Sequence, residues 1–302
     1  METEKIYTPP FKTQGIKTKL IPLIKKNACI DSSQLWIEPF MGSGVVGLNV
    51  APKRAVFADL NPHIVNFYRK LKSRELNTSI VAEYLMEQGA LLSERGEDHY
   101  YFIREKFNNE CDPLDFLFLN RSCFNGMIRF NRKNEFNVPY GHKPQRFSKA
   151  YITKILNQVR HFEEMIRNND WDFYCQSFED TITLANEDSF IYCDPPYIGR
   201  HVDYFDSWDE NQETKLHECL SSSQARFMLS TWKSNQYRSN PYVDTLWGSC
   251  YAATQEHYYF VGAREENRNA MTEALLTNYP MTGSENLMLS LQSTFEQLAI
   301  SL

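Results

Sequence analysis

The sequence predicts an α/β protein with a doubly wound, mostly parallel sheet and a mainly helical insert. Three observations lead to this prediction. Short apolar runs alternate with amphipathic helical stretches in both halves of the chain. A glycine-rich turn directly follows the first of these runs. Between residues 71 and 118 the apolar positions recur at helical spacing, so this middle stretch is expected to interrupt the sheet.

The first elements are expected in the order strand, turn, helix, strand and helix. Leu35–Phe40 is apolar enough for a buried strand, and Arg54–Asp59 is expected to be a second strand that ends in a carboxylate. Asn61 should cap the following helix and Pro62 should occupy its first position, since Asn accepts the unpaired N–H groups there and Pro has none. This order is typical of the beginning of a doubly wound domain.

Strands are expected again in the second half of the chain, separated by helical stretches such as Glu213–Ser222. The expected strands are Phe173–Phe178, Ser189–Cys193, Arg226–Trp232 and Glu273–Tyr279. The intervening segment, residues 62–148, is expected to form an insert with a polar hairpin or turn at Asn131–Pro139. Residues 1–61 and 149–302 would then form one domain around the sheet.

The composition is that of an ordinary globular protein. Of the 302 residues, 42% are hydrophobic, the mean hydropathy is −0.51, and no apolar run approaches the ~18 residues that a membrane span needs. The beginning of the chain lacks the apolar stretch of a secretory signal. Seven scattered cysteines without a Cys-x-x-Cys pair favour reduced thiols over a disulfide framework or a zinc site. The sequence therefore predicts a cytoplasmic protein.

Charge is distributed unevenly along this acidic chain. The net charge of −6 by itself argues weakly against a nucleic-acid binder. However, residues 5–30 contain six lysines and no acid, and residues 121–149 contain seven Lys or Arg and one Glu. A local basic surface on an acidic protein can neutralise phosphates, although charge alone would fit a solvated loop equally well.

The glycine turn belongs to the segment Glu38–Gly44. Because Gly42 and Gly44 lack Cβ atoms, the backbone there can approach a nucleoside-like ligand closely. Asp59, at the end of the second strand, stands where a carboxylate accepts hydrogen bonds from ribose hydroxyls. The dinucleotide fingerprint is incomplete because Gly47 falls at the wrong spacing, so a tight turn without a ligand is an equally good explanation of this feature alone.

The most specific motif is Asp194-Pro195-Pro196-Tyr197, which follows an apolar strand. An exocyclic amine of a nucleobase is a poor nucleophile because its lone pair is delocalised into the ring. A carboxylate and a backbone carbonyl that accept its two N–H groups favour a pyramidal nitrogen that can attack a methyl group. The two prolines fix the backbone, and Tyr197 offers a stacking face for a flipped base. With the glycine turn, this motif predicts methyl transfer from S-adenosylmethionine to a nucleobase amine; the alternative is a structural, Pro-rich strand exit.

Two other chemistries can be set aside. Cytosine C5 methylation needs a cysteine nucleophile, usually after a proline, and the chain contains no Pro-Cys pair. The sequence also argues against phosphate-cradling binding of a nucleoside triphosphate, because no Gly-Lys-Ser/Thr loop is present.

A third segment, Phe124–Arg129, combines an aromatic, an amide, an apolar side chain and an arginine, which suits entry into DNA and reading of guanine. An ordinary helix-to-loop transition would also explain it.

In this order, the motifs resemble those of the Dam-like, alpha-group DNA adenine N6-methyltransferases. The matching stretches are Pro10–Leu20, Trp36–Gly44, Ala58–Asn61, Leu117–Pro139, Tyr174–Phe178 and Ile191–Tyr197. The resemblance implies a class I methyltransferase fold, S-adenosyl-L-methionine as cofactor, double-stranded DNA as partner, base flipping and no metal.

The resemblance also implies a role for each matching residue. Cofactor binding is expected at Lys17, Glu38, Phe40, Gly42, Gly44, Asp59, Phe178 and Asp194. Catalysis on the target adenine is expected at Asp194, Pro195, Pro196 and Tyr197. DNA contacts are expected at Lys12, Phe124, Asn125, Met127 and Arg129, with support of the recognition hairpin from Asn137 and Pro139.

One stretch departs from the family pattern. Many members carry Trp-x-Gly-Gly-Lys near the N-terminus, whereas this chain has Thr13-Gln14-Gly15-Ile16-Lys17, which leaves the contact at position 13 open. The stretches Gln14–Leu20, Asn120–Asn131 and Tyr192–Phe205 are most similar to EcoRV-type modification methyltransferases. That likeness implies the target GATATC. Because each strand of a self-complementary site can be modified separately, a monomer is expected. It would act alongside a restriction endonuclease or leave a solitary methylation mark.

Other functions stay open at this point. Amino methylation of cytosine N4, RNA or a protein glutamine would use the same fold, although Asp194 favours adenine over these acceptors. A DNA-binding module that has lost its activity would also keep the basic segments, but it would have no need of the Asp194 motif.

Overall fold

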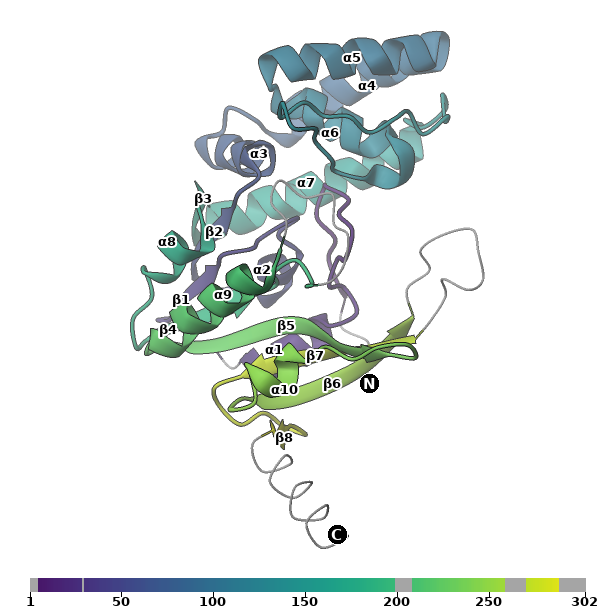
Figure 1. The fold of residues 1–302 in the computed structure, drawn as a ribbon. Coiled ribbons are helices and arrows are strands. Elements are labelled where there is room, and N and C mark those ends of the chain that lie inside the picture. The colour runs from purple at the N-terminus through teal and green to yellow at the C-terminus, as the bar shows by residue number, and fades with distance from the viewer. Residues whose placement is uncertain (1–4, 29, 199–207, 259–269, 288–302) are drawn as a thin grey trace, which may run out of the picture. The chain divides into compact units, whose positions relative to one another are not determined.

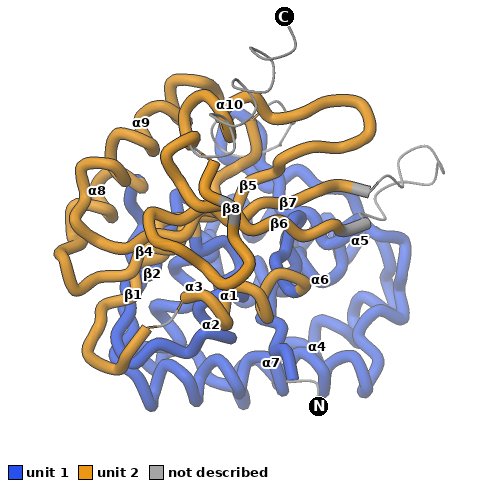
Figure 2. The backbone as a smooth tube through the Cα atoms, turned by 90° about the horizontal axis from the view of Figure 1, so that it is seen from below, with its two compact units in different colours: residues 1–18, 41–177, 201–207 blue, residues 19–40, 178–200, 208–302 orange. Residues whose placement is uncertain are grey.

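The computed structural model describes residues 5–28, 30–198, 208–258 and 270–287 (Figure 1). The chain divides into two compact units that alternate along the sequence (Figure 2). Unit 1 comprises residues 1–18, 41–177 and 201–207, and unit 2 comprises residues 19–40, 178–200 and 208–302. Six of the seven cysteines lie in the described part of the chain and carry free thiols; Cys29 lies outside it.

Unit 1 is mainly helical and contains one pair of parallel strands. β2 (Arg54–Asp59) and β3 (Asp170–Cys175) pair in register from Arg54 opposite Asp170 to Asp59 opposite Cys175. Its helices are α2 (Val45–Val50), α3 (Pro62–Ser73), α4 (Thr78–Arg95), α5 (Glu97–Glu110), α6 (Pro113–Ser122), the 3₁₀ helix η1 (Phe124–Gly126) and α7 (Lys149–Asn168).

The beginning of α3 confirms the capping prediction. The Asn61 side chain accepts hydrogen bonds from the backbone N–H groups of His63 and Ile64, and Pro62 is the first helical residue. These two bonds satisfy donors that would otherwise lack partners in the first turn. The cap fixes where α3 begins, directly after the carboxylate that ends β2.

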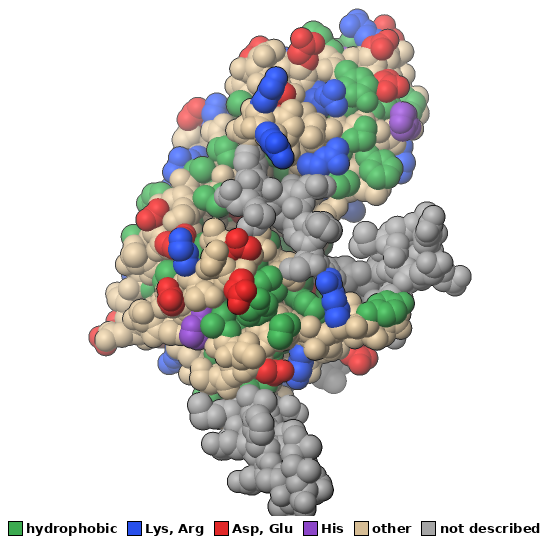
Figure 3. All heavy atoms as spheres, in the orientation of Figure 1, with side chains coloured by type: hydrophobic (Ala, Val, Ile, Leu, Met, Phe, Trp, Pro, Cys, Tyr) green, Lys and Arg blue, Asp and Glu red, His purple; other side chains and the backbone are tan. Residues whose placement is uncertain are grey.

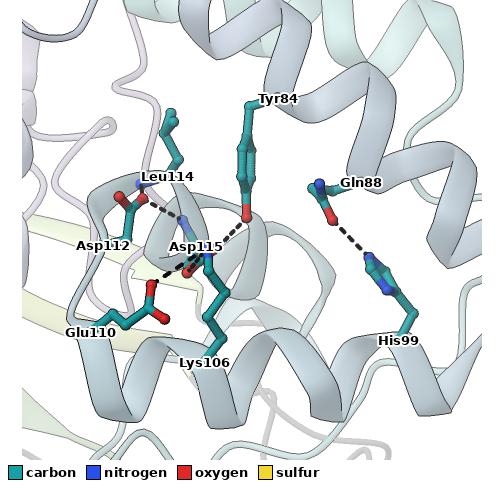
Figure 4. Close-up of polar contacts among 8 residues, drawn as sticks. All are labelled: Tyr84, Gln88, His99, Lys106, Glu110, Asp112, Leu114 and Asp115. Atoms are coloured by element: carbon teal, nitrogen blue, oxygen red, sulfur yellow. Dashed lines mark hydrogen bonds and ion pairs between the residues drawn. The ribbon is translucent and has the colours of Figure 1, made fainter.

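The middle of unit 1 is helical, as predicted, and a buried polar cluster joins three of its helices (Figure 4). Asp115 of α6 is fully buried and accepts a hydrogen bond from Tyr84 of α4. It also forms an ion pair with Lys106 of α5, with 3.0 Å between Nζ and Oδ2. Because the Lys106 side chain is 35% exposed, it compensates the charge of buried Asp115 while it stays partly hydrated, and the cluster links α4, α5 and α6 through Asp115.

The predicted polar hairpin or turn at residues 131–139 is present. Phe130 and Phe136 form an antiparallel bridge, and Asn131 donates its backbone N–H to Glu135 with an N–O distance of 2.9 Å. Asn134 closes the turn in a left-handed conformation with φ of 61°. Asn tolerates that conformation better than most residues, so the tip of the turn follows from the local sequence.

Unit 2 contains a six-stranded sheet in the order β1-β4-β5-β7-β6-β8. β1, β4 and β5 are parallel, whereas β7 is antiparallel to both β5 and β6, and β6 is antiparallel to β8. The strands are β1 (Leu35–Glu38), β4 (Ser189–Cys193), β5 (Arg226–Asn235), β6 (Tyr251–Tyr258), β7 (Ala270–Thr277) and β8 (Glu285–Asn286), and the helices are α1 (Ile21–Ala28), α8 (Phe178–Ile182), α9 (Glu210–Ser222) and α10 (Tyr242–Thr245).

The parallel strands joined through helices confirm the predicted α/β fold. One buried face of the unit 2 sheet packs on α8 and α9, with Ile37, Ile191 and Leu229 of the strands against Leu216 and Leu220 of α9. β4 is buried at every position, as expected for a strand covered on both faces. This packing leaves the carboxyl end of β4, where Asp194 follows, in a fixed place.

Candidate functional site

The glycine turn in unit 1 adopts a backbone that favours glycine. Gly42 and Gly44 have φ angles of 49° and 77°, in the left-handed region where a Cβ atom causes strain. A Cβ at Gly42 would meet no atom within 4 Å, whereas one at Gly44 would lie 3.0 Å from the Phe162 ring. The space at Gly42 is therefore open to a ligand, while Gly44 permits close packing beneath the turn.

Asp59 holds this turn in place. Its carboxylate accepts hydrogen bonds from the backbone N–H groups of Gly42 and Asn61, both at 2.8 Å. Burial raises the pKa of Asp59 above its usual value, and the two N–H donors partly offset that effect. Each carboxylate oxygen keeps a second lone pair, so the predicted ribose acceptor is compatible with its structural role.

Tyr68 supports the turn and was not recognised from the sequence as more than an apolar residue of α3. Its hydroxyl donates to the backbone carbonyl of Ser43 with an O–O distance of 2.7 Å, and its ring stacks on Phe162 at 4.3 Å. The fully buried Tyr68 thus holds the backbone of the glycine turn against α7.

Lys17, in the same unit, is buried, and its Nζ donates to the carbonyl of Gly15 at 3.0 Å.

In unit 2, Glu38 is a buried carboxylate at the end of β1. It accepts a hydrogen bond from the indole Nε1 of Trp36 at 3.0 Å, and it is only 1% exposed. Because an isolated buried charge is costly, this bond helps to explain how the acid is kept at the carboxyl end of the strand. The Trp36 ring stacks on Tyr192 of β4 at 5.8 Å, so β1 and β4 together position Glu38.

Three aromatic rings gather beside β1 in unit 2. Phe40 stacks on Phe178 at 5.4 Å, and Trp208 contacts both rings edge-on or tilted, at 5.5 and 5.7 Å. The predicted cofactor residues Phe40 and Phe178 are therefore brought together. Trp208 had no role assigned from the sequence; its place in this cluster depends on packing between segments far apart in the chain.

The Asp-Pro-Pro-Tyr turn (Asp194–Tyr197) lies directly after β4. The hydroxyl of Tyr197 donates to Oε1 of Glu273 in β7 with an O–O distance of 2.9 Å, and Glu273 is 1% exposed. The Tyr197 ring packs against Trp232 and Met271. Tyr197 is thus held at both its ring and its hydroxyl. Sequence reasoning missed Glu273, because an acid within a largely apolar strand indicates a buried carboxylate but not that the Tyr197 hydroxyl is its partner.

Tyr192 and Cys193, which precede this turn, are buried residues of β4. Tyr192 shares a 2.6 Å hydrogen bond with the Ser230 hydroxyl of β5. Burial, followed by the negative charge of Asp194, raises the pKa values of both Tyr192 and Cys193 well above their usual range. Both side chains support the strand that leads into the turn.

The predicted DNA-contacting residues Lys12 and Phe124–Arg129 are brought together within unit 1. Fully buried Asn120 accepts from the backbone N–H of Lys12 at 2.8 Å and donates to the carbonyls of Lys12 and Gly126, at 2.9 and 3.0 Å. A Cβ atom at Gly126 would lie 2.4 Å from the Lys12 side chain. One amide side chain therefore joins two segments that are more than 100 residues apart in the chain.

The rest of the recognition segment (residues 124–139) displays its side chains on a hydrogen-bonded backbone. Phe124 is 49% exposed, Asn125 is exposed with φ of 54°, and Met127 is half-buried. Arg129 donates to the Asn137 side chain at 2.8 Å, and the Pro139 carbonyl accepts from the Phe124 N–H at 2.9 Å. Figure 3 shows several Lys and Arg side chains near one another on the helical part of unit 1.

The described residues contain no helix long and apolar enough to cross a membrane. Within the same parts of the chain, no group of three or more His, Cys, Asp or Glu side chains is arranged to hold a metal ion. Residues 199–205 of the stretch Tyr192–Phe205 lie outside the described residues.

Both turns follow strands at their carboxyl ends, in the manner of class I methyltransferases. The chain matches the family model for D12 class N6 adenine-specific DNA methyltransferases over residues 14–267, and it belongs to that family.

Three curated relatives are DNA adenine methylases from Serratia marcescens, Escherichia coli K12 and Haemophilus influenzae. They are 33% identical over 193 residues, 35% over 193 and 35% over 200, respectively. The matches cover 62%, 62% and 63% of this chain and 66%, 64% and 64% of those proteins. The chain thus spans just under two-thirds of the length of these relatives. An rRNA methyltransferase structure, AviRa from Streptomyces viridochromogenes, aligns with 95% of this chain and 90% of its own at 10% identity and a TM-score of 0.36.

Proposed function

We propose that this protein methylates the N6 amino group of adenine in a short, specific site of double-stranded DNA. The observation that carries the proposal is the Asp-Pro-Pro-Tyr turn, whose tyrosine is fixed by a hydrogen bond to buried Glu273. Membership of the D12 family supports the same activity. Bound S-adenosyl-L-methionine supplies the methyl group.

Each residue of the turn has a distinct task in this proposal. The Asp194 carboxylate accepts one N–H of the adenine amino group, and a backbone carbonyl of the turn accepts the other. Pro195 and Pro196 hold these acceptors in one geometry. Tyr197 stacks on the flipped base, with its ring orientation set by Glu273, Trp232 and Met271. The chain thereby makes the amine a better nucleophile by position alone, without a covalent enzyme intermediate.

The open space at Gly42 and the acceptor capacity of Asp59 fit the cofactor. We assign Asp59 to its ribose, Phe178 to its adenine ring and Lys17 to its methionine end. The other cofactor residues are Glu38, Phe40, Gly42 and Gly44, together with Asp194.

DNA recognition is assigned to Lys12 and the recognition segment. Lys12 would reach the first guanine of the site, and Phe124, Asn125, Met127 and Arg129 would enter the DNA around the flipped base. The link through Asn120 supports this assignment, because it holds Lys12 beside the segment.

We assign residues 62–148 to the DNA-recognition insert, and residues 1–61 and 149–302 to the catalytic domain.

The finer assignments are the alpha group of the family and an EcoRV-like target, GATATC. The alpha-group placement rests on the order of the motifs along the chain. The EcoRV-like target rests on the stretches Gln14–Leu20, Asn120–Asn131 and Tyr192–Phe205, and on Thr13 and Ile16 in place of the family Trp and Gly. The protein would act in the cytoplasm as a monomer, since the strands of a self-complementary site can be modified one at a time. Its role would be modification of DNA beside a cognate restriction endonuclease.

The test is a map of N6-methyladenine in DNA from a methylation-deficient host that expresses the full chain, with an empty vector as control. Methylation of one adenine in GATATC is expected. Methylation at another sequence would keep the activity and overturn the target. N4-methylcytosine, or no methylated base from a folded, cofactor-binding protein, would overturn the proposed activity.

A further inference from the structure

Three cationic side chains of unit 1 surround the hydroxyl group of one tyrosine, Tyr151, in the first turn of α7. Arg146 donates to this oxygen from Nη2 at 2.7 Å, and Arg121 approaches it from Nη1 at 3.5 Å. Lys12 interacts with the same hydroxyl. The Arg146 guanidinium also lies over the Tyr151 ring, 4.2 Å from its centroid. These contacts join the N-terminal segment, α6 and α7 in one cluster.

This cluster has an excess of positive charge. In the described ranges, no carboxylate forms an ion pair with Lys12, Arg121 or Arg146. Burial, and then the charges of Arg146 and Arg121, lower the pKa of Lys12 despite the interaction with Tyr151. Burial alone would raise the pKa of Tyr151, but the three cations together lower it. Such a cluster would be stabilised by an anion.

The two arginines differ in whether they can contact a ligand. Arg121 is 3% exposed and is held by the carbonyls of Pro9 and Pro10 and by the side chain of Gln158. It is therefore a positioning residue, whose own carbonyl accepts from Nε of Arg146 at 2.9 Å. Arg146 and Tyr151 are half-buried and line a shallow cavity of about 440 Å³ that is open to solvent.

The cavity has both polar and apolar walls. It is lined by Lys143, Pro144, Gln145, Arg146, Ser148 and Tyr151. Ser148 caps α7, and the beginning of this 20-residue helix adds a partial positive charge at the same place. The guanidinium fork and the hydroxyl suit phosphate oxygens, while Pro144 and the Tyr151 ring offer apolar surface that a sugar would cover. A phosphodiester of a nucleic acid offers phosphate oxygens to the polar wall and sugar carbons to the apolar wall, whereas free phosphate offers only oxygens.

We infer that this cavity binds a backbone phosphate of the DNA, through Arg146 and Tyr151, with Arg121 as the residue that positions Arg146. The inference rests on the proposed function, since it assigns a further contact to the same DNA. Such a contact fixes the register of the protein on the duplex and reads no base. It therefore contributes to affinity for every DNA sequence alike.

The test measures binding of the full chain to a GATATC duplex and to an unrelated duplex over a range of salt concentrations. For Arg146→Gln we expect weaker binding to both duplexes and a slope of log K against log[salt] that is shallower by about one. Tyr151→Phe should weaken binding less, and Arg146→Lys should restore the slope while leaving the affinity below that of the unmodified protein. Arg160→Gln, at an exposed position on the opposite side of the same helix from Tyr151, is the matched control and should change neither quantity.

Three results would overturn the inference. The first is an unchanged slope for Arg146→Gln in protein with an unchanged unfolding temperature. The second is a loss confined to GATATC, which would make Arg146 a base-reading residue. The third is that inorganic phosphate raises the unfolding temperature only when Arg146 is present, while DNA binding does not depend on Arg146. That result would assign the cavity to a free anion. Failure of the unmodified protein to bind either duplex would instead overturn the proposed function.

Discussion

The Asp-Pro-Pro-Tyr turn and the recognition segment are held by different kinds of contact. In the turn, the functional side chain itself is fixed, since Tyr197 is 8% exposed and bonded to buried Glu273. In the recognition segment, the backbone is fixed through Asn120, while Phe124 stays 49% exposed. The difference suits the proposed tasks, because chemistry needs groups placed in advance whereas reading DNA needs side chains that can reach a partner.

The largest effect on catalysis is expected at Glu273, which fixes the Tyr197 side chain. Glu273→Gln and Tyr197→Phe should each lower kcat about 10- to 100-fold, because each weakens a hydrogen bond to a charged group worth about 1.5–3 kcal/mol. The Kd for DNA should change little. The kcat of the double variant should be no lower than that of the less active single variant. Single-turnover methylation and DNA binding measure these quantities.

Tyr192→Phe is the control for this pair. It removes a buried hydroxyl from the neighbouring strand, where Tyr192 is bonded to Ser230, so it should cost stability but not kcat. Independent, additive losses for Glu273→Gln and Tyr197→Phe would show that the two residues do not act together.

An intermediate effect is expected at Gly126. Gly126→Ala would place a Cβ 2.4 Å from the Lys12 side chain and should displace it. The loss of one base contact corresponds to about a tenfold fall in affinity for the specific site, while kcat at saturating DNA should be kept. Competition binding with specific and unrelated duplexes measures this effect.

Gly283→Ala is matched in backbone strain, since φ is 77° there, but a Cβ would meet no atom within 4 Å. It should therefore leave DNA affinity unchanged. Equal losses in the two alanine variants would mean that general destabilisation, rather than displacement of Lys12, weakens binding.

A further effect, on stability rather than on rate or affinity, is expected in its pH dependence, through His63 under the recognition segment. His63 is buried, its ring stacks on Phe130 at 4.9 Å, and burial lowers its pKa from 6.5 to about 4. Because the folded-state pKa is depressed, the stability from neutral His63 is complete above pH 6.5 and is lost as the pH falls toward 4. The slope should approach about 1.4 kcal/mol per pH unit within that window.

Urea unfolding at pH 7 and pH 5 measures this slope. His63→Phe keeps an aromatic ring beside Phe107, Phe116 and Phe130 and removes the titrating group, so its stability should depend less on pH. A pH dependence equal to that of the unmodified protein would assign the effect to other groups.

The sequence predicted those elements whose signals are local. Asn61-Pro62 marked the beginning of α3, and apolar runs marked β2 and β4. β6, Tyr251–Tyr258, was missed because its residues do not alternate between apolar and polar. The antiparallel direction of β7 also could not be foreseen, since it depends on its pairing with β5 and β6 rather than on its own residues.

The same limit applies to the site. The glycine turn and the Asp-Pro-Pro-Tyr turn are contiguous motifs and were visible in the sequence. Glu273, Tyr68 and Asn120 support them from distant segments, through contacts that no local pattern marks. A buried polar residue in an apolar element is the one signal that could have pointed to them.

The role of the Asp-Pro-Pro-Tyr turn is tested most directly by comparing the unmodified protein with Asp194→Ala in methyl transfer and in DNA binding. Methylation of a GATATC duplex should fall by about 10³-fold or more. DNA affinity should be kept, because recognition is carried by Lys12 and the recognition segment. Unchanged methylation in Asp194→Ala would contradict the assignment of the Asp-Pro-Pro-Tyr turn to the chemistry.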